Sequence, residues 1–135
     1  MVVVDDVPAT RQRVRMVLEE SGRFEVVGEA GDGASAVAVA TETGPDLTLL
    51  DLSMPGMDGL ETLPRLRAAA PEMKVVVFSG FDVDRVAGIV GDLGADGYIE
   101  KGAAADALVE QLTAVLEQPG FTPGLPGPGP ADRFD

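Results

Sequence analysis

Short apolar runs alternate with longer amphipathic segments along residues 1–118. The runs have the length and β-branched content of buried strands, and they cover residues 1–4, 24–29, 47–52, 74–78 and 97–100. The segments between and after them carry apolar residues at helical spacing, which predicts a helix from Pro8 to just before Gly22 and helices over 34–43, 59–70, 82–93 and 104–118. Five successive strand–helix units predict an α/β domain with a parallel sheet and helices on both faces.

The periodicity also assigns the inward faces of two helices. The third helix is expected to bury Leu60, Leu63 and Leu66, and the last helix Leu108, Leu112, Val115 and Leu116. Asp6 suits the N-cap of the first helix. Pro64 removes a backbone donor, so we expect a kink there or a position in the first turn.

The composition changes abruptly after residue 118. Residues 119–135 are rich in proline and glycine, which argues against a helix or a central strand. We therefore expect a folded domain in residues 1–118 and a linker or tail in residues 119–135.

Charge and missing residue types exclude several functions. The chain of 135 residues has a formal net charge of −13, which disfavours binding to nucleic acid or to an anionic membrane. It contains no cysteine and no histidine, so thiol chemistry and phosphohistidine chemistry within the chain are excluded. The first residues lack the pattern of a signal peptide, and no apolar run approaches the length of a membrane span, so a cytoplasmic protein is expected.

Polar side chains gather where the predicted strands end. Asp5 and Asp6, Ser79 and Lys101 follow the first, fourth and fifth apolar runs, and Asp51 lies at the end of the third. Because parallel strands place their carboxyl ends at one edge, these groups should meet there. Carboxylates suit Mg²⁺, and the backbone carbonyl of Ser53 would be a further ligand. Taken singly, the groups have ordinary explanations.

Those explanations are specific to each residue. Asp5 and Asp6 could be a helix cap, Ser79 a structural hydroxyl, and Lys101 a solvated surface charge. Tyr98 could be a core residue. The repetition at four strand ends favours a common site.

Four segments together resemble the receiver domain of two-component response regulators. They are Asp5-Asp6, the segment 51–59 (DLSMPGMDG), Ser79-Gly80 and the segment 94–101 (GADGYIEK). The resemblance implies a flavodoxin-like, doubly wound (βα)5 fold with strand order 2-1-3-4-5. It further implies that Asp51 is the phosphoacceptor, that Asp5 and Asp6 bind Mg²⁺ with it, that Lys101 contacts the phosphoryl group, and that Ser79 and Tyr98 form a switch pair.

The resemblance also implies partners. A sensor histidine kinase would phosphorylate Asp51, and the surface of the fourth helix, fifth strand and fifth helix would change in response. The segment 26–33 (VVGEAGDG) is similar to the LuxR/NarL-type subfamily, which implies transcriptional output through a DNA-binding domain that this chain lacks. Homodimer formation is left open by the sequence. The absence of Lys and Arg between Lys101 and Arg133 argues against the charged dimer that one large subfamily forms through its fourth helix, fifth strand and fifth helix.

Two other functions remain as alternatives. A stand-alone receiver would signal without an attached output domain. A Mg²⁺-dependent aspartyl phosphatase would need an acid two residues after its nucleophile, and Ser53 occupies that position. We therefore expect a phosphoacceptor and not an enzyme. By the resemblance, Phe81 lies at a position that flanks the hydrolytic water, and its bulky apolar side chain should impede that water and prolong the life of the phosphorylated form.

Overall fold

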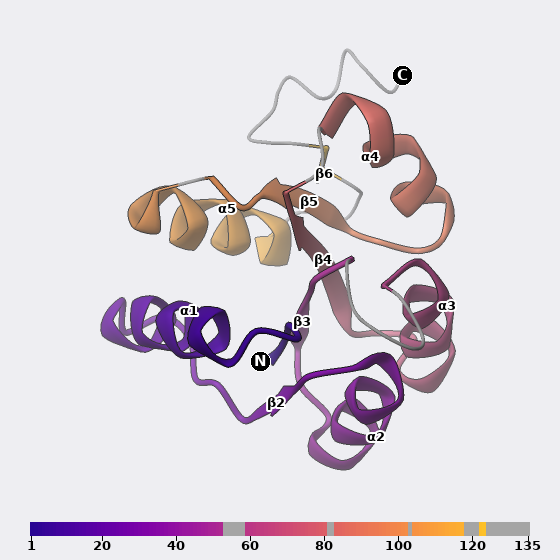
Figure 1. The fold of residues 1–135 in the computed structure, drawn as a ribbon, viewed down its shortest axis with the longest axis horizontal. Helices are drawn as coiled ribbons and strands as arrows, with labels where there is room; N and C mark the ends of the chain where they lie inside the picture. Colours follow the sequence, from indigo (N-terminus) through magenta and orange to yellow (C-terminus); the bar gives the residue numbers. More distant parts are fainter. Residues whose placement is uncertain (53–58, 81–82, 103, 118–121, 124–135) are drawn as a thin grey trace.

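A computed structural model describes residues 1–52, 59–80, 83–102, 104–117 and 122–123 (Figure 1). Its sheet contains β1 (Val2–Val4), β2 (Gly28–Ala30), β3 (Leu47–Leu50), β4 (Lys74–Ser79) and β5 (Gly97–Glu100). All neighbouring pairs are parallel and the order is β2-β1-β3-β4-β5, which confirms the predicted fold.

A short sixth strand lies within the segment predicted to be a linker or tail. β6 (Thr122–Pro123) pairs in parallel with the outer side of β5. An edge position tolerates proline, because one side of an edge strand needs no backbone donor. The remainder of residues 118–135 lies outside the described part of the chain.

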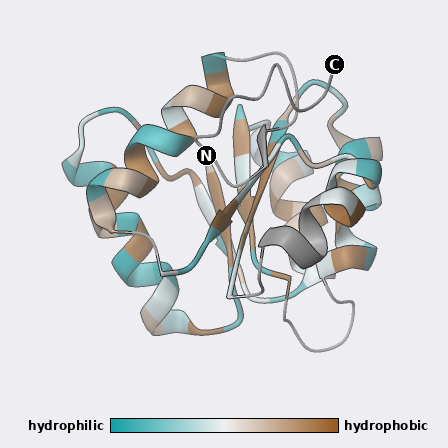
Figure 2. Ribbon diagram, turned by 90° about the horizontal axis from the view of Figure 1, so that it is seen from above, coloured by the Kyte–Doolittle hydropathy of each residue, from teal (hydrophilic) through white to brown (hydrophobic). Residues whose placement is uncertain are grey.

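Five helices cover the two faces of the sheet. α1 (Pro8–Glu20) and α5 (Ala105–Glu117) lie on one face, and α2 (Gly33–Thr43), α3 (Gly59–Ala69) and α4 (Val83–Asp92) lie on the other (Figure 1). The apolar colouring of Figure 2 concentrates on the strands, whereas the helices mix polar and apolar residues. No helix among the described residues is long and apolar enough to cross a membrane.

Alternate residues of each strand enter separate cores. Val2 and Val4 pack with α2 and α3, whereas Val3 packs with α1 and α5. This follows from the two-residue period of a strand, which points successive side chains to opposite faces. Both faces are apolar because helices cover both.

Two residues that were expected to face inward are exposed. Leu60 is 38% exposed and Leu116 is 39% exposed, so both predictions were wrong. α3 instead buries Thr62 beside Leu63 and Leu66, and α5 buries Val109. The buried positions keep spacings of three and four residues; Leu60 lies in the first turn of α3 at the margin of its stripe, and Leu116 lies in the last turn of α5.

The second strand is shorter than its apolar run predicted. Residues 24–27 precede β2, whose pairing with β1 begins at Val2 opposite Gly28. β1 has three residues, so it offers no partner for a longer ladder. The Val27 N–H donates to the Met1 carbonyl at 2.8 Å and continues the pairing by one bond.

Pro64 lies inside α3, beyond its first turn. Proline has no backbone N–H, so the helix carbonyl one turn earlier loses its usual hydrogen-bond donor. Because Pro64 lies on the exposed side of the helix, water can bond to that carbonyl instead. Of the two expected positions, the first turn was therefore wrong.

Arg67 of α3 ties together the segments that lead into β4 and β5. Its guanidinium donates to the carbonyls of Pro71, Met73 and Gly94. It also pairs with Asp96 Oδ2 at 2.6 Å, and the same oxygen accepts from the Val75 N–H at 2.8 Å. This network fixes the edge of the sheet opposite to the strand ends that carry the predicted site.

Candidate functional site

The register of the sheet brings Asp5 and Asp51 together. Val4 of β1 pairs with Leu50 of β3, so the next residue of each strand is an aspartate. The Asp51 N–H donates to the Val4 carbonyl at 3.0 Å. Both carboxylates are nearly inaccessible, with 2% exposure for Asp5 and 3% for Asp51. Two acids from distant parts of the sequence are therefore adjacent and buried.

Asp6 completes a group of three acids. Each of Asp5, Asp6 and Asp51 offers a carboxylate oxygen, and these oxygens lie within 4.8 Å of one another. Asp6 is exposed and gives the group an opening to solvent. Clustered carboxylates repel one another, and a divalent cation relieves that repulsion. Hard oxygen donors with an open side fit Mg²⁺, which binds through few carboxylates and keeps several waters.

The helix-cap explanation for the two N-terminal acids was wrong. Val7 occupies the N-cap position of α1, and no side chain caps that helix end. Asp5 Oδ1 instead accepts from the Val7 N–H at 2.9 Å, which orients its carboxylate between the strand and the helix. Asp6 is therefore not used as a cap.

Lys101 reaches back from the end of β5 to two of the acids. Its Nζ lies 2.8 Å from Asp5 Oδ2 and 3.3 Å from Asp51 Oδ1. Partial burial lowers the pKa of Lys101, but the hydrogen bond to Asp5 and the charge of Asp51 outweigh it, so this pKa lies above its ordinary value. Lys101 is thus a charged ammonium, with 31% of its side chain exposed, and it contributes positive charge at the mouth of the site.

Ser79 and Tyr98 occupy the neighbouring strands. Ser79 ends β4 and is 1% exposed, and its carbonyl accepts from the Lys101 N–H at 2.8 Å. Tyr98 of β5 is fully buried and belongs to the core beneath α2, α3 and α4. The structure therefore places Ser79 at the edge that holds the acids and Tyr98 in the core. Ser53 and Phe81 lie outside the described residues.

Gly59 supports the site in a way that the sequence motif did not reveal. A Cβ at Gly59 would lie 2.4 Å from Leu52 Cα and 2.6 Å from the Asp51 carbonyl oxygen. The Gly59 N–H also donates to the Leu52 carbonyl at 3.0 Å. The first residue of α3 therefore packs directly on the backbone that carries Asp51. Its place at the end of the DLSMPGMDG motif was the available signal.

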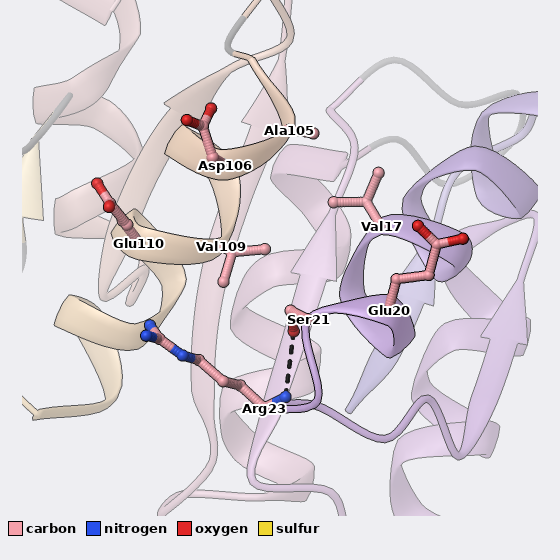
Figure 3. A pocket seen from close by; sticks show the side chains of 8 residues that line it. All are labelled: Val17, Glu20, Ser21, Arg23, Ala105, Asp106, Val109 and Glu110. Carbon is pink, nitrogen blue, oxygen red and sulfur yellow. Dashed lines mark hydrogen bonds between the residues drawn. The ribbon is translucent and has the colours of Figure 1, made fainter.

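A groove of about 390 Å³ between α1 and α5 is separate from this site (Figure 3). Its lining comes from the last turn of α1, the residues that follow it and the first half of α5: Val17, Glu20, Ser21, Arg23, Ala105, Asp106, Val109 and Glu110. None of the three clustered acids lines it. The groove therefore adds nothing to the chemistry of the strand ends.

Comparison with known proteins gives one consistent family. The model described as response regulator receiver domain matches residues 1–113. The nitrate/nitrite response regulator protein NarP of Escherichia coli is 40% identical over 114 residues, which are 84% of this chain and 53% of NarP. A nitrate/nitrite response regulator homologue of Haemophilus influenzae is 33% identical over 87% of this chain and 56% of that protein. The chain thus spans about half the length of these relatives.

Solved structures agree with the sequence relatives. The signal receiver domain of a response regulator described as NarL from Mycobacterium tuberculosis has a TM-score of 0.80 and 34% identity, over 87% of this chain and 95% of that one. A LuxR-family response regulator from Aurantimonas has a TM-score of 0.84 and 29% identity, over 90% and 87% of the two chains. The likeness therefore extends over nearly all of the described fold.

Proposed function

The chain belongs to the response regulator receiver domain family, of the LuxR/NarL type, and from this we propose that Asp51 accepts a phosphoryl group from a sensor histidine kinase. The observation that carries the proposal is the group of Asp5, Asp6 and Asp51 with Lys101 in contact with two of its members. A buried strand-end carboxylate beside a fixed ammonium is suited to attack an anionic phosphoryl group.

Asp5, Asp6 and Asp51 would hold Mg²⁺, with the backbone carbonyl of Ser53 as the fourth protein ligand. Bound Mg²⁺ would supply positive charge against the acids and the phosphoryl oxygens. The fit rests on the donor chemistry of the three carboxylates and on their opening to solvent through Asp6.

The proposed transfer is a single displacement at phosphorus. An Asp51 carboxylate oxygen forms the new P–O bond while the P–N bond of the donor phosphohistidine breaks. The departing imidazole nitrogen keeps the bonding electron pair and takes up a proton, which leaves a neutral histidine on the kinase and an acyl phosphate on Asp51. Lys101 then exchanges its contacts with Asp5 and Asp51 for contacts with the phosphoryl oxygens. Storage of one phosphoryl group, without turnover of a substrate, is the expected activity.

The proposed output is a change of surface. Ser79 would hydrogen-bond to the new phosphoryl group and Tyr98 would respond, so that the surface of α4, β5 and α5 changes. Transcriptional control would then act through a DNA-binding domain outside this chain, as the names of the longer relatives suggest, and a stand-alone receiver is the alternative. A homodimer and a cytoplasmic location belong to the same proposal.

Labelling with acetyl phosphate tests the assignment of Asp51. Mass spectrometry should detect one added phosphoryl group per chain in the presence of MgCl₂, none with EDTA, and none in Asp51→Asn. Equal labelling of Asp51→Asn would contradict the proposal. Repeated turnover of an external phosphomonoester would instead support the aspartyl phosphatase alternative.

Amide chemical shifts test the switch. Addition of beryllofluoride with Mg²⁺ should shift amide resonances of α4 in the wild-type protein, and Ser79→Ala should reduce those shifts while Asp51 still binds the analogue. Unchanged resonances in residues 83–94 of the wild-type protein would contradict the proposed response of α4.

A further inference from the structure

Arg11 connects three elements behind the acidic group. It lies in the first half of α1, where its Nη1 donates to the backbone carbonyl of Asp5 at 2.6 Å. Its Nε donates to Glu29 Oε1 on β2 at 3.1 Å. The guanidinium thus bridges a strand carboxylate and the peptide group that joins Asp5 to Asp6. The side chain is 20% exposed, so much of this bridge is shielded from solvent.

The bridged peptide group decides where Asp6 lies. Asp5 is already held by its N–H, which donates to the Ala30 carbonyl at 3.0 Å, and by its carboxylate. The Asp6 carboxylate has no hydrogen-bond or ion-pair partner among the described residues, and Asp6 lies between β1 and α1. The position of the Asp6 carboxylate therefore depends on the orientation of the Asp5–Asp6 peptide group. Arg11 holds the carbonyl oxygen of that peptide group.

We propose that Arg11 is a positioning residue for the cation site: held by Glu29, it fixes the Asp5–Asp6 peptide so that both carboxylates face Asp51. This inference rests on the proposed Mg²⁺ site. It assigns to Arg11 the orienting role that outer partners of metal ligands commonly have. Arg suits this role better than Lys, because its planar fork can serve a carboxylate and a carbonyl together.

Charge and positioning predict opposite effects of removing Arg11. A guanidinium beside a cation site repels the cation, so its loss should strengthen Mg²⁺ binding if charge alone matters. If Arg11 positions the acids, its loss should weaken binding. The sign of the change in affinity therefore distinguishes the two roles.

Arg15 provides a matched control on the same helix. Its Nη1 donates to Glu29 Oε2 at 2.7 Å, so it shares the strand carboxylate with Arg11. Among the described contacts it has none with Asp5, and it pairs otherwise with Glu19 at 3.4 Å. Arg15→Gln removes one positive charge and one bond to Glu29, as Arg11→Gln does, without touching the Asp5 carbonyl.

Isothermal titration with MgCl₂ tests the proposal on the full chain. Arg11→Gln should weaken Mg²⁺ binding by about tenfold or more, and Arg15→Gln should change it less than about twofold. Affinity that is unchanged or stronger in Arg11→Gln overturns the proposal, as does an equal loss in both variants. A wild-type protein that binds no Mg²⁺ would refute the proposed function itself, together with this inference.

Gly31→Ala gives a second test that retains Arg11 and its charge. A Cβ at Gly31 would lie 3.3 Å from Arg11 Nη1 and 4.0 Å from the Asp5 carbonyl oxygen. The flexible end of Arg11 should yield to it, so the fold is preserved while the contact with Asp5 is disturbed. We expect weaker Mg²⁺ binding than in the wild-type protein at unchanged Tm without Mg²⁺. Unchanged binding, with the Arg11 resonances shifted in the NMR spectrum, would overturn the proposal.

Discussion

Lys101 and Asp5, 96 residues apart in the sequence, form an ion pair of 2.8 Å at the edge of the sheet. The same ammonium lies 3.3 Å from Asp51. Lys101 therefore neutralises part of the repulsion between two buried carboxylates, and it competes with any cation that these carboxylates bind.

Lys101→Met should make this competition visible. The variant leaves two buried acids without their shared ammonium, and we expect it to lose about 1–2 kcal/mol of unfolding free energy, less than for a fully buried pair because Lys101 is partly exposed. Mg²⁺ should bind more tightly and restore much of that stability. Urea unfolding with and without MgCl₂ measures both effects, and a variant with weaker Mg²⁺ binding than wild type would contradict the competition.

Gly59→Ala should destabilise the protein through a clash with the backbone of Asp51 and Leu52. We expect a loss of roughly 1–3 kcal/mol, because the backbone contacts at 2.4 and 2.6 Å cannot move as a side chain does. Gly88→Ala is the matched control, since a Cβ there meets no atom within 4 Å and α4 gains a better helix former. It should be neutral or stabilising in thermal unfolding. Equal Tm values for the two variants would show that Gly59 is not tightly packed.

Glu29 should make stability depend on pH in the acid range. The hydrogen bond from Arg15 lowers the pKa of Glu29; burial opposes this, and the bond from Arg11 reinforces it. Stability from this group is therefore complete above its unfolded pKa of about 4.3 and is lost as the pH falls through the lower folded value.

Urea unfolding at pH 6 and at pH 3.5 measures this contribution. The difference in unfolding free energy between wild type and Glu29→Gln should shrink at the lower pH. Glu19→Gln is the control, because Glu19 belongs to an exposed pair with Arg15. A difference that stays constant with pH for Glu29→Gln would contradict the assignment.

Asp96→Ala should cost roughly 1.5–3 kcal/mol of unfolding free energy. The variant removes the acceptor of both Arg67 and the Val75 N–H, and these are charge-assisted bonds. Mg²⁺ affinity should stay at the wild-type value, because the network lies at the opposite edge of the sheet from Asp51. Asp92→Ala, an exposed position on α4, should leave Tm unchanged. A large change in Mg²⁺ affinity for Asp96→Ala would show coupling between the two edges.

The sequence predicted a parallel sheet and the convergence of polar strand ends, because both follow from periodicity and parallel pairing, whereas the strand order came from the resemblance to the receiver family. It was less accurate for features that depend on a partner element. β2 is shorter than its apolar run because β1 offers three residues for pairing. Leu60 and Leu116 keep helical spacing but lie in the first turn of α3 and the last turn of α5, where they are exposed.

Within the site, the residue types were predictable and their contacts were not. Lys101 was expected at the phosphoryl group, and the structure shows the acids that hold it. The clash at Gly59 and the bridge made by Arg11 depend on distances between backbone segments, which a single sequence does not encode in any local pattern.

The pairing of Val4 with Leu50 has a consequence for folding quality. A slip of β3 by one residue against β1 would reverse the faces of its side chains and move Asp51 away from Asp5. The proposed cation site requires these two strands to be aligned correctly. If Mg²⁺ binds as proposed, it binds selectively to the correctly registered sheet, and adding Mg²⁺ during refolding should favour that alignment over slipped alignments.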